Sequence, residues 1–156
     1  MSKTMKLKPL IISILIPLLV GGLSSLLSLN GFKSFETINK PSFTPPGIAF
    51  PIAWIILYIL MGISSYIIYS SKCKERLLAL KTYIIQLGFN FFWPILFFSF
   101  KLYWVAFVWL VALFVFIALM VYRFYKCEKS AGLLQLPYLA WVLFAGVLNL
   151  FVALMN

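Results

Sequence analysis

The sequence predicts an all-α membrane protein, built as a single bundle of five transmembrane helices. Hydrophobic residues fill 64% of the 156 positions and only 10% are charged, whereas about a quarter of a soluble domain is charged. Five apolar runs are each long enough to cross a hydrocarbon layer of about 30 Å. Most connections between them are short, so we expect one membrane domain over residues 1–156.

The five expected spans cover residues 9–29, 47–70, 77–99, 103–122 and 133–155. They are expected to be helices because a segment in lipid must satisfy its own backbone hydrogen bonds, and these runs are too long for barrel strands. Lysines precede the first run, as in a signal peptide. That run is longer than a typical signal core and no A-x-A site follows it, so we expect a retained span.

The first connection, residues 30–46, is long for a bundle loop. Long ordered loops are often lids or binding loops. Pro41, Pro45 and Pro46 stiffen its end. We therefore expect this segment to form a stiff lid over the interior of the bundle.

The basic residues predict the orientation. The net charge is +10, and ten of the 13 Lys and Arg residues fall in the N-terminal tail and in the second and fourth connections. Basic residues favour the cytoplasmic side, so the N-terminus is expected inside and the C-terminus outside. With this hydrophobicity, the charge indicates a membrane rather than a nucleic acid as the partner. Cys73 and Cys127 fall on the same side, where a reducing compartment would leave them as free thiols.

Several classes of chemistry are excluded by composition. The chain has no His and no Asp, and its three acidic residues are Glu36, Glu75 and Glu128, all in expected connections. This excludes a Ser-His-Asp triad, a paired-carboxylate acid–base site and a His-based metal centre. A proton-coupled exporter is also disfavoured, because no carboxylate is left for the membrane interior.

Three spans carry polar and aromatic residues at helical spacing. The second span has Phe50, Trp54, Tyr58, Met61 and Ser65; the third has Tyr83, Gln86, Asn90, Trp93 and Phe97; the fifth has Tyr138, Trp141, Ala145 and Asn149. Two interpretations remain open. The amides could simply join helices, as polar groups do in membrane bundles. Alternatively, aromatic walls with a few polar groups could form a small-molecule pocket.

These motifs together resemble the TspO/MBR family, which comprises the tryptophan-rich sensory proteins of bacteria and the mitochondrial translocator protein, or peripheral benzodiazepine receptor. The resemblance rests on Lys40-Pro-Ser-Phe-Thr-Pro-Pro before Trp54, Tyr83-x-x-Gln86-Leu87-x-x-Asn90-x-x-Trp93, and Leu136-Pro137-Tyr138-x-x-Trp141-x-x-x-Ala145-x-x-x-Asn149. Family order and spacing are kept over nearly the whole chain. Phe43 and Ile48 stand where the family often has tryptophan.

The resemblance implies a binding protein for porphyrins such as protoporphyrin IX, for sterols, and for isoquinoline or benzodiazepine drugs. It requires no cofactor, forms homodimers and, for a bacterial member, lies in the plasma membrane. The implied ligand-binding residues are Pro45, Pro46, Phe50, Trp54, Tyr58, Gln86, Asn90, Trp93, Tyr138, Trp141, Ala145 and Asn149. Lys33 or Lys40 could pair with porphyrin propionates, or be ordinary interfacial lysines. The alternative function is light- and oxygen-dependent protoporphyrin breakdown, with Trp54 and Trp141 as the candidate catalytic residues.

Overall fold

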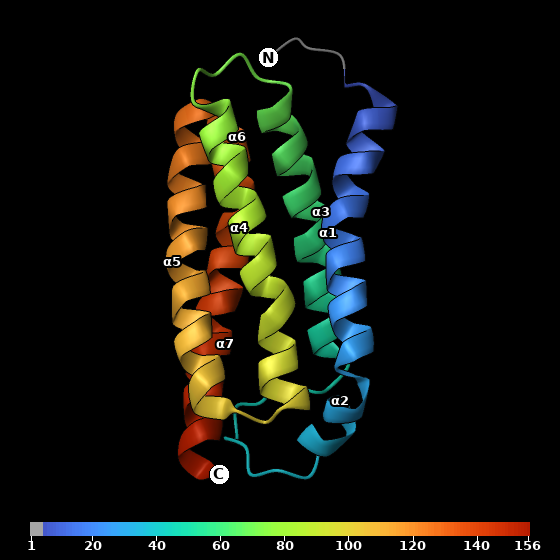
Figure 1. Ribbon diagram of the computed structural model, residues 1–156, viewed down its shortest axis with the longest axis vertical. Coiled ribbons are helices and arrows are strands. Elements are labelled where there is room, and N and C mark those ends of the chain that lie inside the picture. Colours follow the sequence, from blue (N-terminus) through green and yellow to red (C-terminus); the bar gives the residue numbers. More distant parts are fainter. Residues whose placement is uncertain (1–4) are drawn as a thin grey trace.

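The computed structural model describes residues 5–156 and confirms an all-helical bundle with five helical segments able to span a membrane. Figure 1 shows the elements in order: α1 (Leu7–Leu27), α2 (Leu29–Phe35), α3 (Ala49–Tyr69), α4 (Arg76–Pro94), the π-helical turn η1 (Ile95–Ser99), α5 (Tyr103–Cys127), α6 (Lys129–Leu134) and α7 (Leu136–Met155). The observed spans are Leu7–Leu27, Ala49–Tyr69, Arg76–Ser99, Tyr103–Cys127 and Lys129–Met155.

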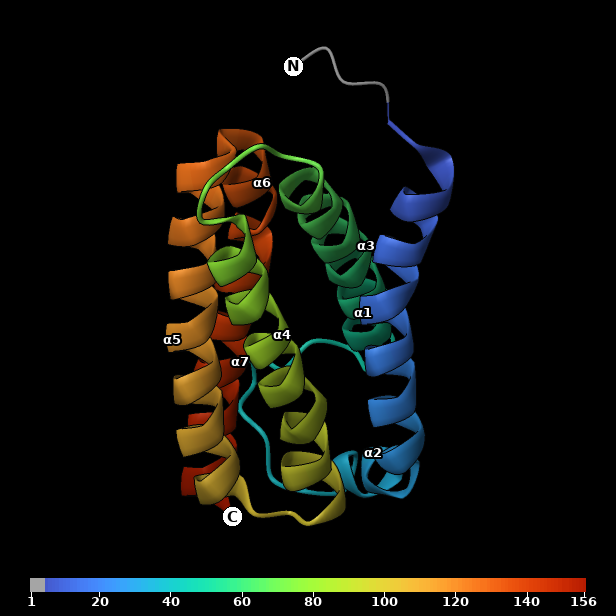
Figure 2. The ribbon, with the colours of Figure 1, turned by 45° about the horizontal axis from the view of Figure 1, so that its top comes forward.

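The core lies where α5 packs on α4 and α7, while α1 stands at one edge of the bundle against α3 (Figure 2). One stripe of α5 is fully buried, at Leu110, Leu113, Ile117 and Met120. Apolar residues elsewhere on α5 and α1 are exposed, as expected for surfaces that face hydrocarbon. The bundle is therefore held together by the packing of α5 on α4 and α7 and by that of α1 on α3.

The two ends of the bundle differ. The start of α1, the α3–α4 connection and α6 lie at one end, and α2, the η1–α5 connection and the C-terminus lie at the other (Figure 1). We name the first the basic end, because its connections and adjoining turns carry Lys6, Lys8, Lys72, Lys74, Arg76, Lys81, Arg123, Lys126 and Lys129. Lys3, counted with them above, lies outside the described residues. We name the second the lid end.

The expected lid loop is partly helical. The chain turns at Ser28, whose hydroxyl donates to the Ser24 carbonyl oxygen at 2.9 Å, and then resumes as α2. Gly31 lets α2 approach η1, because a Cβ atom there would collide with the backbone of Phe98. The rest of the segment crosses the lid end without regular structure as far as α3 (Figure 1). Apolarity alone did not predict this helix because α2 is short and mixed in composition.

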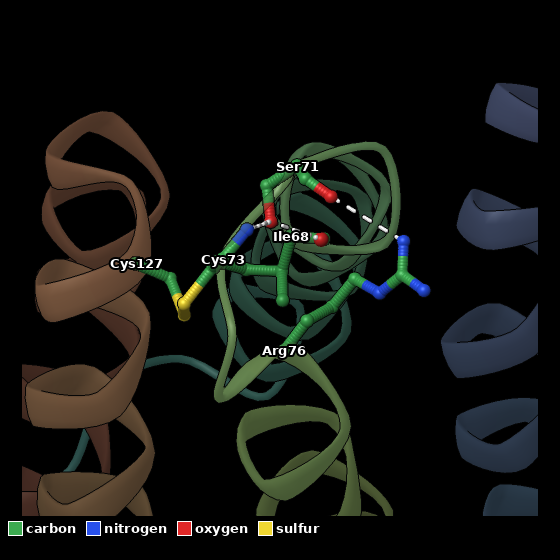
Figure 3. The surroundings of a disulfide bond; sticks show 5 residues. All are labelled: Ile68, Ser71, Cys73, Arg76 and Cys127. Carbon is green, nitrogen blue, oxygen red and sulfur yellow. Dashed lines mark hydrogen bonds between the residues drawn. A yellow bond between two sulfur atoms is a disulfide. The ribbon is translucent and has the colours of Figure 1, made fainter.

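The prediction of two free thiols is wrong. Cys73 and Cys127 form a disulfide at the basic end, with Cα atoms 5.3 Å apart (Figure 3). The α3–α4 connection approaches the last turn of α5 there, and its own contacts fix its path: the Ser71 hydroxyl donates to the Ile68 carbonyl at 2.7 Å, and Arg76 donates to the Ser71 carbonyl at 3.3 Å. The prediction of free thiols follows from the reducing cytoplasm alone, and the sequence does not show that Cys73 and Cys127 lie close together.

Replacing both cysteines by serine is expected to lower the thermal unfolding midpoint, because the bridge joins residues 54 positions apart. A disulfide closing such a loop contributes about 2–4 kcal/mol in soluble proteins. We expect the lower part of that range, since membrane helices stay inserted on unfolding. The measurement is thermal unfolding in detergent with and without reductant. Reductant should lower the midpoint of the wild type but not that of the double variant; equal midpoints for all samples would contradict the prediction.

Candidate ligand pocket

An aromatic pocket lies in the lid-end half of the bundle, enclosed by α2, α3, α4, η1 and α7. Its lining residues are Phe35, Phe50, Trp54, Trp93, Phe97, Phe98, Trp141, Ala145, Leu148 and Asn149. The Trp54 and Trp141 rings meet edge to face, with centroids 6.4 Å apart, and Phe50 meets Trp141 at 6.0 Å. Such a wall suits a flat apolar ligand, because aromatic rings give large contact areas at defined geometry.

The pocket is closed in this structure. The free space between its side chains is about 10 Å³, which is roughly enough for one water molecule. Sites for drug-sized ligands enclose about 300–1,000 Å³. Phe35 of α2 lines the pocket, and the centroid of its ring lies 5.3 Å from that of Phe98 and 5.7 Å from that of Phe97. A large ligand therefore requires these rings to move apart.

The path of the lid is fixed by one contact within it and by bonds to the end of α7. Within the lid, Lys40 donates to the Phe35 carbonyl at 2.9 Å and lies 4.9 Å from the centre of the Phe35 ring. At the end of α7, Asn39 and Asn156 exchange hydrogen bonds, with the Asn156 amide donating to the Asn39 carbonyl at 2.8 Å and the Asn39 backbone donating to the Asn156 side chain at 3.2 Å. The segment therefore spans from the end of α1 to the end of α7.

A buried hydrogen-bonded chain lies behind the pocket. The Tyr58 hydroxyl donates to Asn90 Oδ1 at 2.9 Å, and Asn90 Nδ2 donates to the Tyr138 hydroxyl at 2.7 Å. The Tyr138 hydroxyl donates in turn to Gln86 Oε1 at 2.6 Å. The chain joins α3, α4 and α7, which favours the helix-joining interpretation for these two amides. It also fixes Tyr58, whose ring stacks on Trp54 at 5.5 Å.

Asn149 acts in a similar way at the pocket itself. Its Oδ1 accepts from Trp93 Nε1 at 3.0 Å, and its Nδ2 donates to the Tyr103 carbonyl at 2.9 Å. Asn149 therefore positions the Trp93 ring. By contrast, the buried Nε1 of Trp141 has no hydrogen-bond partner among the described residues. Trp141 Nε1 is therefore a candidate donor to a ligand.

The structure brings together most of the residues expected from the sequence. Six of them line the pocket: Phe50, Trp54, Trp93, Trp141, Ala145 and Asn149. Tyr58, Gln86, Asn90 and Tyr138 form the chain behind it, while Pro45 and Pro46 lie in the lid segment outside the lining. Phe43 packs on Phe151 with centroids 5.5 Å apart, and Ile48 is exposed; neither lines the pocket.

Three lining residues were missed by sequence reasoning: Phe35, Phe98 and Leu148. Phe35 was assigned to a loop because α2 is short. Phe98 lies outside the α-helical stripe that includes Trp93 and Phe97, and reaches the pocket because the chain widens into the π-helical turn η1. Leu148 is adjacent to Asn149 on α7 and carried no distinguishing signal.

The family assignment follows from sequence comparison. The profile of the TspO/MBR family matches residues 13–155. The chain belongs to the TspO/MBR family. It is 37% identical to the tryptophan-rich protein TspO of Archaeoglobus fulgidus, over 97% of this chain and 99% of the relative. It is 34% identical to the translocator protein of Bos taurus, over 76% of this chain and 72% of the relative.

A third TspO/MBR relative is the tryptophan-rich sensory protein of Cereibacter sphaeroides, 33% identical over 74% of this chain and 72% of the relative. The matches cover bacterial, archaeal and animal members of the TspO/MBR family. This chain has five tryptophans, and three of them, Trp54, Trp93 and Trp141, line the pocket. The tryptophan content is thus concentrated around one site.

Proposed function

We propose that this membrane protein binds flat hydrophobic ligands of the tetrapyrrole class, such as protoporphyrin IX, in the aromatic pocket. The observation that carries the proposal is the convergence of Trp54, Trp93 and Trp141 from three helices on one apolar site. Sterols and isoquinoline or benzodiazepine drugs belong to the same broad chemistry. Ligand entry requires α2 and Phe35 to move away from η1, because the closed pocket holds about 10 Å³.

The chemistry of the site favours binding over catalysis. Stacking on aromatic rings provides the contact area, and Trp141 Nε1 offers a hydrogen-bond donor. Lys33 and Lys40 belong to the lid end, where they can pair with propionate groups. Lys40 would then exchange its bond to the Phe35 carbonyl for a carboxylate, which would remove a contact that holds the lid in its present path.

The test is a titration of the purified protein with protoporphyrin IX in the dark, measuring bound porphyrin by absorbance. Wild type is compared with the Trp54→Phe/Trp141→Phe double variant, which keeps the apolar character but loses area and the free N–H. We expect at least tenfold weaker binding, corresponding to about 1.4 kcal/mol. Trp104→Phe is the control, since Trp104 is exposed on α5. Equal affinity of wild type and the double variant would refute the proposal.

Light- and oxygen-dependent porphyrin breakdown is the alternative function, with O₂ as the oxidant of the excited porphyrin and the neighbouring Trp54 and Trp141 rings as redox participants. It predicts that the absorbance of bound protoporphyrin falls under illumination in wild type and not in the double variant. Equal bleaching in both, at equal porphyrin occupancy, would exclude a role for the two tryptophans.

We also propose a homodimer in a bacterial plasma membrane, with the basic end in the cytoplasm; the reducing compartment would there keep Cys73 and Cys127 as thiols, and their disulfide would form only on oxidation. After reduction of intact cells, a membrane-impermeant thiol reagent should then fail to label Cys73 and Cys127, which lie at that end. Labelling of these cysteines in intact cells would show that the basic end lies outside the cell. Cross-linking in native membranes tests the dimer: a band at twice the chain mass is expected, and a monomer band alone would contradict it.

A further inference from the structure

Polar side chains cross the bundle interior at three successive levels. Tyr58 meets Asn90 at the first level, and Gln86 meets Tyr138 at the second. The helices α4 and α7 both run from the basic end towards the lid end (Figure 1). The residues three positions before Gln86 and Tyr138 are therefore both about 4.5 Å nearer the basic end. They are Tyr83 and Gln135.

The third level is completed from α3. Ser65 lies seven residues after Tyr58 on α3, and Tyr83 lies seven residues before Asn90 on the antiparallel α4, so both stand two turns towards the basic end. The Ser65 side chain lies beside the Tyr83 hydroxyl. The Gln135 backbone is helical and its carbonyl accepts from Leu139, so Gln135 keeps the helical register of α7.

The second and third levels together hold most of the unpartnered polar atoms of the interior. Among residues 5–156, Gln86 Nε2 and both amide atoms of Gln135 are buried without a hydrogen-bond partner, and the buried Tyr83 hydroxyl has only the Ser65 side chain beside it. Gln86 and Gln135 are completely buried. The Ser65 hydroxyl already donates to the Gly62 carbonyl at 2.9 Å. Buried polar groups left without partners are costly, and more so in a membrane.

We propose that Tyr83, Gln86 and Gln135 bind water inside the membrane domain. Internal water commonly satisfies groups of this kind with about three hydrogen bonds. The atoms include both donors and acceptors: the Gln86 and Gln135 amide nitrogens donate, the Gln135 oxygen accepts, and the Tyr83 hydroxyl does either. These groups are uncharged, which suits an uncharged ligand such as water. The inference does not depend on the proposed function, because Gln86 is the last member of the hydrogen-bonded chain behind the pocket and Tyr83 and Gln135 lie further towards the basic end.

The sequence offers a direct test. Gln86 and Gln135 are the only glutamines, so labelling with side-chain ¹⁵N-glutamine gives two amide groups, one at the second level and one at the third. In perdeuterated detergent we expect magnetisation transfer from water to these amide protons. The Asn90 amide, labelled separately, is the control, because it is bonded to Tyr138 and should show none. Glutamine amides that show no contact with water would overturn the proposal.

A substitution gives a second measurement. Gln135→Met keeps the length of the side chain and removes both polar atoms. If Gln135 holds water, the unfolding midpoint should fall by about 2–4 °C, since Tyr83 and Gln86 lose the ligand that Gln135 helps to hold. If the amide is simply unpaired, removing it relieves a cost and the midpoint rises. A rise overturns the proposal; a fall together with the water signal supports it. A fall without that signal would show a direct amide bond instead, and would also overturn it.

Discussion

Replacing Gly62 with alanine is expected to force α1 away from α3 and to destabilise the protein by about 1–3 kcal/mol or more. A Cβ atom at this position would collide with the Cα atom of Ile14 and lie 2.8 Å from the Ser13 carbonyl oxygen. Both are backbone atoms, so no side-chain rotation relieves the contact. Small residues permit such close approach of membrane helices. The measurement is the midpoint of thermal unfolding in detergent.

Gly22→Ala is the matched control, because Gly22 is also helical and a Cβ atom there would meet nothing within 4 Å. Alanine favours the helix over glycine by roughly 0.5–1 kcal/mol, so this variant should be unchanged or slightly more stable. If Gly62→Ala were as stable as Gly22→Ala, the α1–α3 crossing described above would be wrong.

Replacing Asn90 with leucine is expected to cost about 2 kcal/mol of unfolding free energy. The change keeps the size of the side chain but leaves the buried Tyr58 hydroxyl without its acceptor and removes the donor to Tyr138. Interhelical hydrogen bonds in membranes contribute about 0.6–2 kcal/mol, and an unsatisfied buried group adds its own cost. Denaturation by SDS titration measures the difference.

A double-mutant cycle separates the bond from packing. Tyr58→Phe removes the hydroxyl that Asn90→Leu would strand, so the double variant should be less destabilised than the sum of the two single variants. The remaining Tyr138–Gln86 bond is left intact by both changes. Additive effects would contradict the chain described behind the pocket.

Much of this molecule could be predicted because hydrocarbon imposes few solutions. Apolar length alone located five helices, and helical spacing grouped Trp54, Trp93 and Trp141 on faces that meet in one pocket. The same spacing did not separate pocket residues from joining residues: Asn90 lies behind the pocket, and Asn149 holds Trp93. The hydrogen-bond partner of an amide depends on the neighbouring helix, and the residue spacing of the helix that carries the amide does not predict that partner.

The features that sequence reasoning missed depend on tertiary contacts between short segments. The helix α2 is stabilised by its packing on η1, where Gly31 approaches Phe98, rather than by its own propensity. The π-helical turn redirects Phe98 towards the pocket. The bridge between Cys73 and Cys127 depends on where the α3–α4 connection meets α5. Each of these three features forms only through contacts in the packed bundle, so the sequence alone did not predict it.

The central claim is that a tetrapyrrole binds among the pocket tryptophans. The most direct measurement illuminates the protoporphyrin complex briefly in air and locates oxidised tryptophans by peptide mass spectrometry. The five tryptophans provide an internal control, since Trp54, Trp93 and Trp141 line the pocket and Trp104 and Trp109 lie on α5. We predict oxidation concentrated on the pocket three and suppressed by a competing dark ligand. Oxidation concentrated on Trp104, which is exposed, with the pocket tryptophans spared, would contradict the account.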